Sequence, residues 1–262
     1  MSNKSAKKFD YDDYKLDFLA AKKGNTSIYD AESDCREALY PEFNNYIFVW
    51  EYGFYFLVLA IKHTKINSSY GIIASYHTEA LSSLRAAFLC NLNGYQSDSI
   101  NILRRVHDSE IRALFCRYQP MKMESIVNTS SLQGFHNKLK MSFLNNLYNV
   151  PSSFTHGNKM KAIKTWNEVL NEELVGIDYG CQIDKNMFSY AAKLSIFWLY
   201  FLIRVIPILF DNQVGIYWIE KQEESLRFLK DYLVATESGL AKSCDELEES
   251  LKKLDFSVQK TA

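Results

Sequence analysis

The side chains best suited to chemistry lie on a segment, 69–118, that has the pattern of a helical hairpin. With residues placed at about 100° intervals around each helix, His77 lies in the middle of the apolar face of the first helix. Arg104 and His107 lie within the apolar face of the second helix, and Glu110 lies at its edge. If the helices pair antiparallel, we expect His77 near Glu110 and His107 about one turn from Arg104.

These polar groups on apolar faces admit three interpretations. One is a structural network in which every group has a partner, because an unpaired buried group costs about 1–3 kcal/mol; Arg104 would then bond Asp108 or another carboxylate. A second is a functional site in which the arginine binds an anion and a histidine titrates. A third is a metal site of His77, His107 and Glu110. Because no ligand pair at i, i+4 supports the third, we expect neither a metal nor another cofactor.

A second candidate is the segment 151–157, in which three hydroxyl side chains, Ser152 among them, flank His156. The proline and the glycine at its ends predict a loop. Two interpretations stay open for this histidine. It belongs to a helix cap with its hydroxyl neighbours, or it acts as an acid, a base or a donor to an anion.

Several large enzyme classes are excluded by their missing motifs. The sequence contains no G-x-x-x-x-G-K-[ST], G-x-G-x-x-G, G-x-S-x-G or H-E-x-x-H. It is therefore not a P-loop nucleotidase, a Rossmann dehydrogenase, an α/β-hydrolase or a zincin protease. The five cysteines are dispersed and form no C-x-x-C pair. Near the N-terminus, an acidic stretch at 10–13 stands where an export signal would have an apolar segment. Together with the odd number of cysteines, this predicts a cytoplasmic protein.

The composition predicts an all-α fold. The chain of 262 residues has only 10 Gly and 4 Pro, which disfavours turn-rich β architectures and permits long helices. Its hydrophobic fraction of 47% is that of a globular protein, and its net charge of −1 lacks the overall basic character of a nucleic-acid binder. We expect one domain over 1–262, a multi-helix bundle built around the antiparallel hairpin, with a polar tail at 1–8.

The expected elements follow from apolar periodicity and from Gly, Pro and Asn positions. An aromatic-rich helix should start near residue 33 and run to about 64, with Pro41 either kinking it or opening a new helix. The others are a helix at 10–23 capped by Gly24, hairpin helices at 69–92 and 97–118 joined by Asn93-Gly94, a helix at 134–148, a loop at 149–158, an amphipathic helix at 163–174, a connector at 176–184 and a very apolar helix at 185–210.

Two interpretations apply to the C-terminal pair of helices expected at 212–256. Apolar residues recur there every seven positions, at Ile219, Leu226, Leu233, Leu240, Leu247 and Leu254. The alternate coiled-coil positions are mostly polar, which favours amphipathic helices laid on the core over a dimerising arm. The helix at 185–210 carries Lys193 and Arg204, so we expect a buried core helix there and keep a membrane span as the alternative.

The hairpin and the loop together resemble a known kind of protein. The helix carrying Leu103-Arg104 is followed four residues on by the acid Asp108, and a later Ser152-x-x-x-His156 lies in the predicted loop. This pattern resembles an uncharacterised all-helical bacterial family that is distantly HEPN-like. Many HEPN-type domains belong to toxin–antitoxin and antiviral defence systems. Their ribonuclease members use Arg-x(4–6)-His, which this sequence lacks before all five of its histidines.

The resemblance implies a site and a function. Arg104 and His156 are the candidate catalytic residues, and Asp108 and Ser152 support them. We expect a helical protein–protein interaction module of a bacterial defence or toxin–antitoxin system, acting with a protein partner or as a homodimer. The first alternative is a HEPN-like metal-independent nuclease, or another anion-handling enzyme, with RNA or a nucleotide as substrate. The second alternative is a membrane-acting effector.

Overall fold

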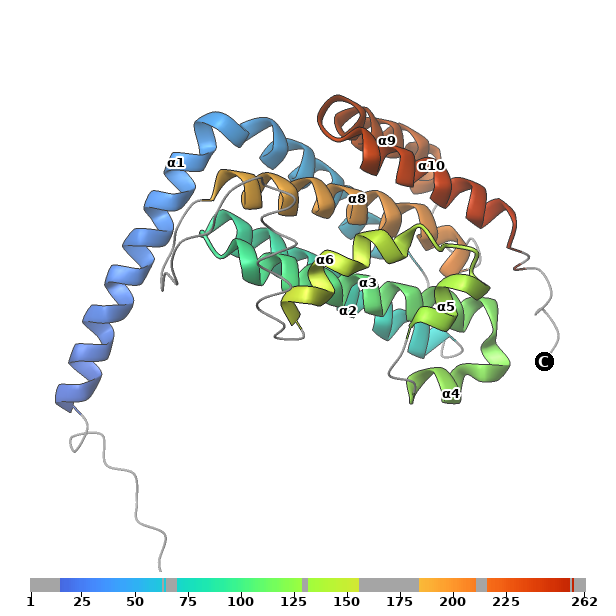
Figure 1. The fold of residues 1–262 in the computed structure, drawn as a ribbon, viewed down its shortest axis with the longest axis horizontal. Helices are drawn as coiled ribbons and strands as arrows, with labels where there is room; N and C mark the ends of the chain where they lie inside the picture. Colours follow the sequence, from blue (N-terminus) through green and yellow to red (C-terminus); the bar gives the residue numbers. More distant parts are fainter. Residues whose placement is uncertain are drawn as a thin grey trace, which may run out of the picture.

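The computed structural model describes residues 15–62, 64, 70–128, 132–155, 184–210, 216–254 and 256. For 15–29, 133, 150, 152–155, 216 and 217 it describes the backbone alone. All regular structure in these residues is helical, which confirms the all-α bundle. The helices form layers around one long central helix (Figure 1).

The central helix is α8 (Lys185–Leu209), which contacts α1, α2, α3, α9 and α10. Its first turn is capped by Asp184, whose carboxylate accepts hydrogen bonds from the backbone N–H groups of Asn186 and Met187, both at 2.9 Å. Most of its side chains are buried, in agreement with the expected core helix. Within the described residues, α8 is also the one helix long and apolar enough to cross a membrane, and 78% of its most apolar window lies inside the bundle.

The hairpin forms as predicted from α2 (Gly71–Leu92) and α3 (Gln96–Tyr118). Gly94 between them has φ of 85°, a conformation that favours glycine and lets the chain reverse in a short turn. The two helices pack along their whole length on one side of α8, while α9 and α10 cover another side (Figure 1). This arrangement turns the apolar faces of the hairpin, with their polar residues, into the core.

The N-terminal helix differs from the prediction. The expected break at Gly24 is wrong, because α1 (Lys15–Lys62) continues through it as one helix. A glycine inside a helix costs only about 1 kcal/mol, which the rest of a long helix offsets. Pro41 lies within α1, and the helix bends at Phe43, where φ is −114° and ψ is 15°. The stretch after the bend packs on α8 and α9, and the stretch before it extends away from the bundle (Figure 1).

The segment after the hairpin is more broken than predicted. It contains η3 (Pro120–Lys122), α4 (Met123–Val127), α5 (Gln133–Lys138) and α6 (Leu144–Thr155). The single helix expected at 134–148 is wrong, because Lys140 adopts a positive φ of 54° and separates α5 from α6.

The loop expected at 149–158 is also wrong as far as residue 155. Pro151 lies inside α6, and the backbone stays helical to Thr155. A proline inside a helix removes the hydrogen bond to the carbonyl of Leu147, and its ring clashes with that carbonyl, at a cost of about 3 kcal/mol. Because Leu144 and Pro151 are buried where α6 packs on α3, tertiary contacts keep this turn helical. The rest of that loop and the helix expected at 163–174 lie outside the described residues, as does the connector apart from Asp184.

The C-terminal pair consists of α9 (Ile216–Thr236) and α10 (Ser238–Lys252). Five of the six heptad residues are buried against this chain, namely Leu226, Leu233, Leu240, Leu247 and Leu254. Ile219 is 38% exposed. The heptad leucines therefore pack on the core of their own chain, and they are not a surface for a partner.

Candidate functional site

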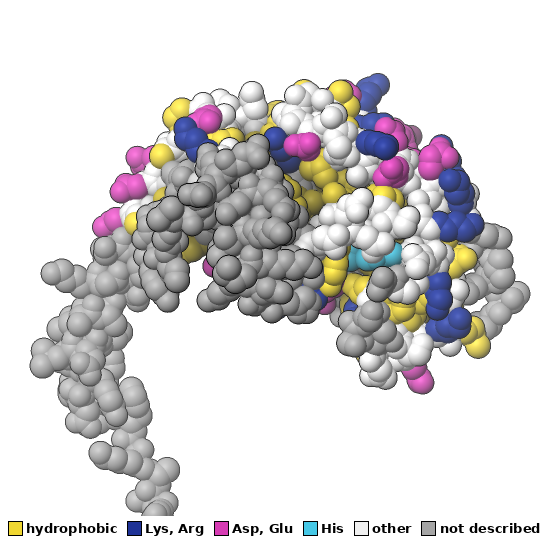
Figure 2. Space-filling model, in the orientation of Figure 1, with side chains coloured by type: hydrophobic (Ala, Val, Ile, Leu, Met, Phe, Trp, Pro, Cys, Tyr) yellow, Lys and Arg dark blue, Asp and Glu magenta, His cyan; other side chains and the backbone are white. Residues whose placement is uncertain are grey.

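A cluster of polar side chains joins α3 to α5 and α6. We call it the His107–His136 cluster, and it consists of Arg104, His107 and Asp108 on α3, His136 on α5, and Asn145 and Tyr148 on α6. Both imidazoles are buried, with exposed fractions of 2% for His107 and 1% for His136. On the face that α5 and α6 cover, Figure 2 shows a histidine side chain among uncharged atoms.

Hydrogen bonds connect the cluster from one end to the other. His107 Nε2 and His136 Nε2 lie 2.9 Å apart. At the outer nitrogens, His107 Nδ1 is 3.0 Å from Asp108 Oδ1, and His136 Nδ1 is 2.7 Å from Asn145 Oδ1. The His107 ring also lies against Tyr148, with centroids 4.7 Å apart, and against Trp198 of α8, at 5.5 Å. Each of the two histidine rings thus has a hydrogen-bond partner at both of its nitrogens.

The hydrogen-bond partners restrict where the protons lie. The Asp108 carboxylate can only accept, so His107 Nδ1–H donates to it, and neutral His107 presents a bare Nε2. His136 Nε2–H then donates to that nitrogen. If His136 also faces the Asn145 amide oxygen, it carries protons on both nitrogens and is cationic. If His136 is neutral, its bare Nδ1 requires the amide of Asn145 to turn by 180° so that Nδ2–H donates.

Burial favours the neutral state of the pair. Burial lowers the pKa of His107, against the opposing effect of Asp108. Burial and the neighbouring imidazole of His107 lower the pKa of His136. Both histidines are therefore neutral at pH 7. Each group then donates a hydrogen bond to the next, from Asn145 to His136, from His136 to His107, and from His107 to Asp108. Protonation of the pair requires the Asn145 amide to rotate.

Arg104 lies at the more exposed edge of the cluster. Its Nε is 3.6 Å from Asp108 Oδ2, and its guanidinium carbon lies 5.2 Å from the centroid of the Tyr148 ring. The side chains of Arg104 and Asp108 are 15% and 29% exposed. This ion pair is the one predicted under the first interpretation, in which Arg104 bonds Asp108. Arg104 Nε is buried without a hydrogen bond to any described residue.

A second buried pair confirms the predicted antiparallel register of the hairpin. His77 Nδ1 lies 3.1 and 3.0 Å from the two carboxylate oxygens of Glu110. Both side chains are almost fully buried, and the His77 ring meets the edge of Phe210 with centroids 5.8 Å apart. Its Nε2 has no hydrogen-bond partner among the described residues. Both members of the pair are therefore closed to solvent.

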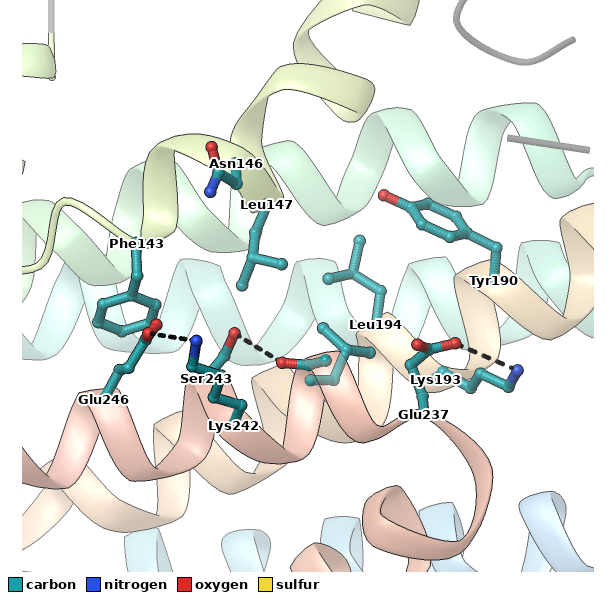
Figure 3. Close-up of a pocket in the computed structure, with 12 residues that line it drawn as sticks. Phe143, Asn146, Leu147, Tyr190, Lys193, Leu194, Glu237, Lys242, Ser243 and Glu246 are labelled. Carbon is teal, nitrogen blue, oxygen red and sulfur yellow. Dashed lines mark hydrogen bonds and ion pairs between the residues drawn. The ribbon is translucent and has the colours of Figure 1, made fainter. Parts of the chain in front are cut away.

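An open pocket of about 450 Å³ lies between α6, α8 and α10 (Figure 3). Its apolar lining includes Phe143, Leu147 and Leu194. At its rim, the ammonium group of Lys193 lies 3.5 Å from the carboxylate of Glu237. None of the side chains predicted to do chemistry lines this pocket. Its charged groups are paired with one another, so they do not single out a charged ligand.

The structure brings together half of the predicted site. Arg104 and Asp108 are adjacent on α3, whereas His156 and the side chain of Ser152 lie outside the described residues. His77 and Glu110 meet each other, and His107 contacts a different group, His136, so the three do not form the metal site of the third interpretation. Among the described residues, no group of three or more His, Cys, Asp or Glu side chains is arranged to hold a metal ion.

Sequence reasoning missed the partners of His107. The sequence predicts a helix over 134–148 but does not show which face of it His136 occupies, and it gives no partner for Asn145 or Tyr148. His136 and Asn145 are nine residues apart, but the turn at Lys140 brings them into contact. The one available indication was the position of His136 next to the apolar Phe135, since an imidazole that becomes buried must find a partner.

Comparisons of this chain with family models, with curated proteins and with solved structures found no match.

Proposed function

We propose that the chain is a helical interaction protein of the kind that serves in bacterial defence or toxin–antitoxin systems, with the His107–His136 cluster as a structural lock that ties α5 and α6 to α3. The burial of both imidazoles is the observation that carries the lock. A catalytic acid or base must reach the substrate, and neither ring is open to solvent. The link to defence or toxin–antitoxin systems depends on the resemblance of the sequence alone.

A second candidate is a metal-independent nuclease or another anion-handling enzyme, as in HEPN-like ribonucleases. Two titratable imidazoles in contact, beside a guanidinium with an unbonded buried Nε, favour this candidate. In that case Arg104 would bind a phosphate group, and the histidine pair would supply and accept a proton. A membrane-acting effector gains less support, because the one candidate span within the described residues is the core helix of the bundle.

One set of variants separates the lock from the enzyme. We would compare wild type with Arg104→Gln, His136→Ala, His156→Ala and the exposed control Thr78→Ala, following bacterial growth on expression and cleavage of end-labelled RNA in EDTA. The lock predicts no arrest and no cleavage by any protein. It also predicts that His136→Ala lowers the free energy of unfolding by about 1–3 kcal/mol, since it leaves His107 Nε2 unpaired.

The opposite pattern would favour the enzyme. Arrest and RNA cleavage by wild type, both lost in Arg104→Gln or His156→Ala while the free energy of unfolding is unchanged, would contradict the lock. The interaction itself is tested by co-purifying the tagged chain with the products of adjacent genes.

A further inference from the structure

The outer side of α1 carries a row of exposed side chains after the bend. We call this row the α1 stripe, and it consists of Asn44, Phe48, Glu51, Tyr55, Val58 and Lys62, all exposed. The two rings are the most exposed of its apolar members, 63% for Phe48 and 64% for Tyr55. Three of its six members, Phe48, Tyr55 and Val58, are exposed large apolar side chains, and an exposed apolar patch rimmed by polar residues marks an interaction site.

The opposite side of α1 holds this row in place. Trp50 stacks on Phe88 of α2, with ring centroids 3.7 Å apart. Gly53 lies so close to α9 that a methyl group built on it would be 3.0 Å from Leu229 Cδ2. Because the inner side is fixed by these contacts, the stripe keeps its outward orientation. Phe48 has Phe228 as a neighbouring ring, at 6.2 Å, and still exposes most of its surface.

The spacing of the stripe is symmetric. Its members are separated by 4, 3, 4, 3 and 4 positions, which is the same pattern in both directions about residue 53. A two-fold axis maps a surface onto itself, so a helix with this spacing can pair antiparallel with its own copy. We propose that the α1 stripe binds the α1 stripe of a second copy, antiparallel, about a two-fold axis beside residue 53. This inference rests on the proposed function and names its partner.

The chemistry of the pairs agrees with this register. The axis places Phe48 against Val58 of the second copy, which is an apolar pair. It places Glu51 against Tyr55 of the second copy, where the phenol can donate to the carboxylate. Asn44 then faces Lys62 of the second copy, and the amide oxygen can accept from the ammonium group.

Parallel pairing of the same stripes is disfavoured by charge. It would bring each Glu51 against the other and each Lys62 against the other, and like charges in contact repel. The antiparallel register separates both sets. Avoiding like-charge contacts therefore favours the antiparallel arrangement that the spacing also permits.

The size of the stripe predicts a weak dimer. An aromatic side chain has a surface of about 200 Å², so Phe48 and Tyr55 each expose about 130 Å². The stripe spans 44–62, about 27 Å of helix. A stable interface buries about 800 Å² on each partner, which one helix face does not supply. We expect a reversible dimer whose population rises with protein concentration.

Sedimentation velocity of the full chain over a wide concentration range tests the dimer. We expect the weight-average sedimentation coefficient to rise with concentration for wild type. The double variant Phe48→Ser/Tyr55→Ser should weaken association and raise the dissociation constant at least 10-fold. The control Met121→Ser/Val234→Ser removes two exposed apolar side chains elsewhere, 89% and 59% exposed, and should behave as wild type. A monomer at all concentrations, or equal effects of both double variants, would overturn the inference.

Disulfide trapping tests the register. In a background with Cys90→Ser and Cys181→Ser, the pair Phe48→Cys/Val58→Cys should give a covalent dimer under mild oxidation, and Phe48→Cys alone should not. Trapping by the single variant would show parallel pairing and overturn the proposed register. If the chain is monomeric yet still co-purifies with a different protein, the homodimer fails while the proposed interaction function stands.

Discussion

The buried pair of His77 and Glu110 gives the sharpest prediction about the hairpin. Glu110 has 0% exposure, and both of its oxygens face one imidazole nitrogen. Replacing His77 with Phe keeps a ring in the site but leaves the carboxylate without a partner. Breaking a buried pair in this way costs about 3–5 kcal/mol of unfolding free energy.

The partner substitution should cost less. In Glu110→Met the Nδ1 of the remaining His77 loses its partner, so the penalty is that of an unpaired polar group, about 1–3 kcal/mol. In the double variant His77→Phe/Glu110→Met no unpaired polar group remains, and apolar groups of similar volume fill the site. We expect it to lie within about 1.5 kcal/mol of wild type, because such replacements are often neutral.

Urea unfolding followed by circular dichroism at 222 nm measures all four proteins, with Thr78→Ala on the exposed side of α2 as a control. The two single substitutions should be strongly non-additive, with a coupling of several kcal/mol. A double variant as unstable as the sum of the two single variants would refute the reasoning, since each group would then contribute independently.

Three further predictions use the same measurement. Because burial lowers the pKa of His107 and His136 below the 6.5 of the unfolded chain, their stabilisation is complete above about pH 6.5 and is lost as pH falls through the folded pKa values. Wild type should thus lose more stability between pH 7.5 and pH 5 than His136→Asn does; an equal loss would contradict this. Removing the cap of α8 with Asp184→Ala should cost about 1 kcal/mol, and Asp184→Asn much less. Leu233→Ala should cost about 2–5 kcal/mol, whereas its exposed neighbour Val234→Ala should cost under about 0.5 kcal/mol, and similar costs would show that the heptad leucines do not face the core.

The sequence alone determined the helices that depend on local periodicity and turn chemistry. The hairpin followed from two long apolar faces and from Asn93-Gly94, because these are properties of neighbouring residues. The contact of His77 with Glu110 also followed, since an antiparallel register about a short turn fixes which residues face each other. The core helix 185–210 was recognisable because its apolar residues cover most of its circumference.

The tertiary structure decided where helices continue, where they break and which distant side chains meet. Gly24 and Pro151 end helices by local preference, but the length of α1 and the packing of α6 on α3 outweigh those preferences. The positive φ of Lys140 brings Asn145 on α6 against His136, and the short helices η3 and α4, which connect α3 to α5, bring His136 against His107. Such a contact joins residues 29 positions apart through an irregular turn, and apolar periodicity carries no information about the path of an irregular turn.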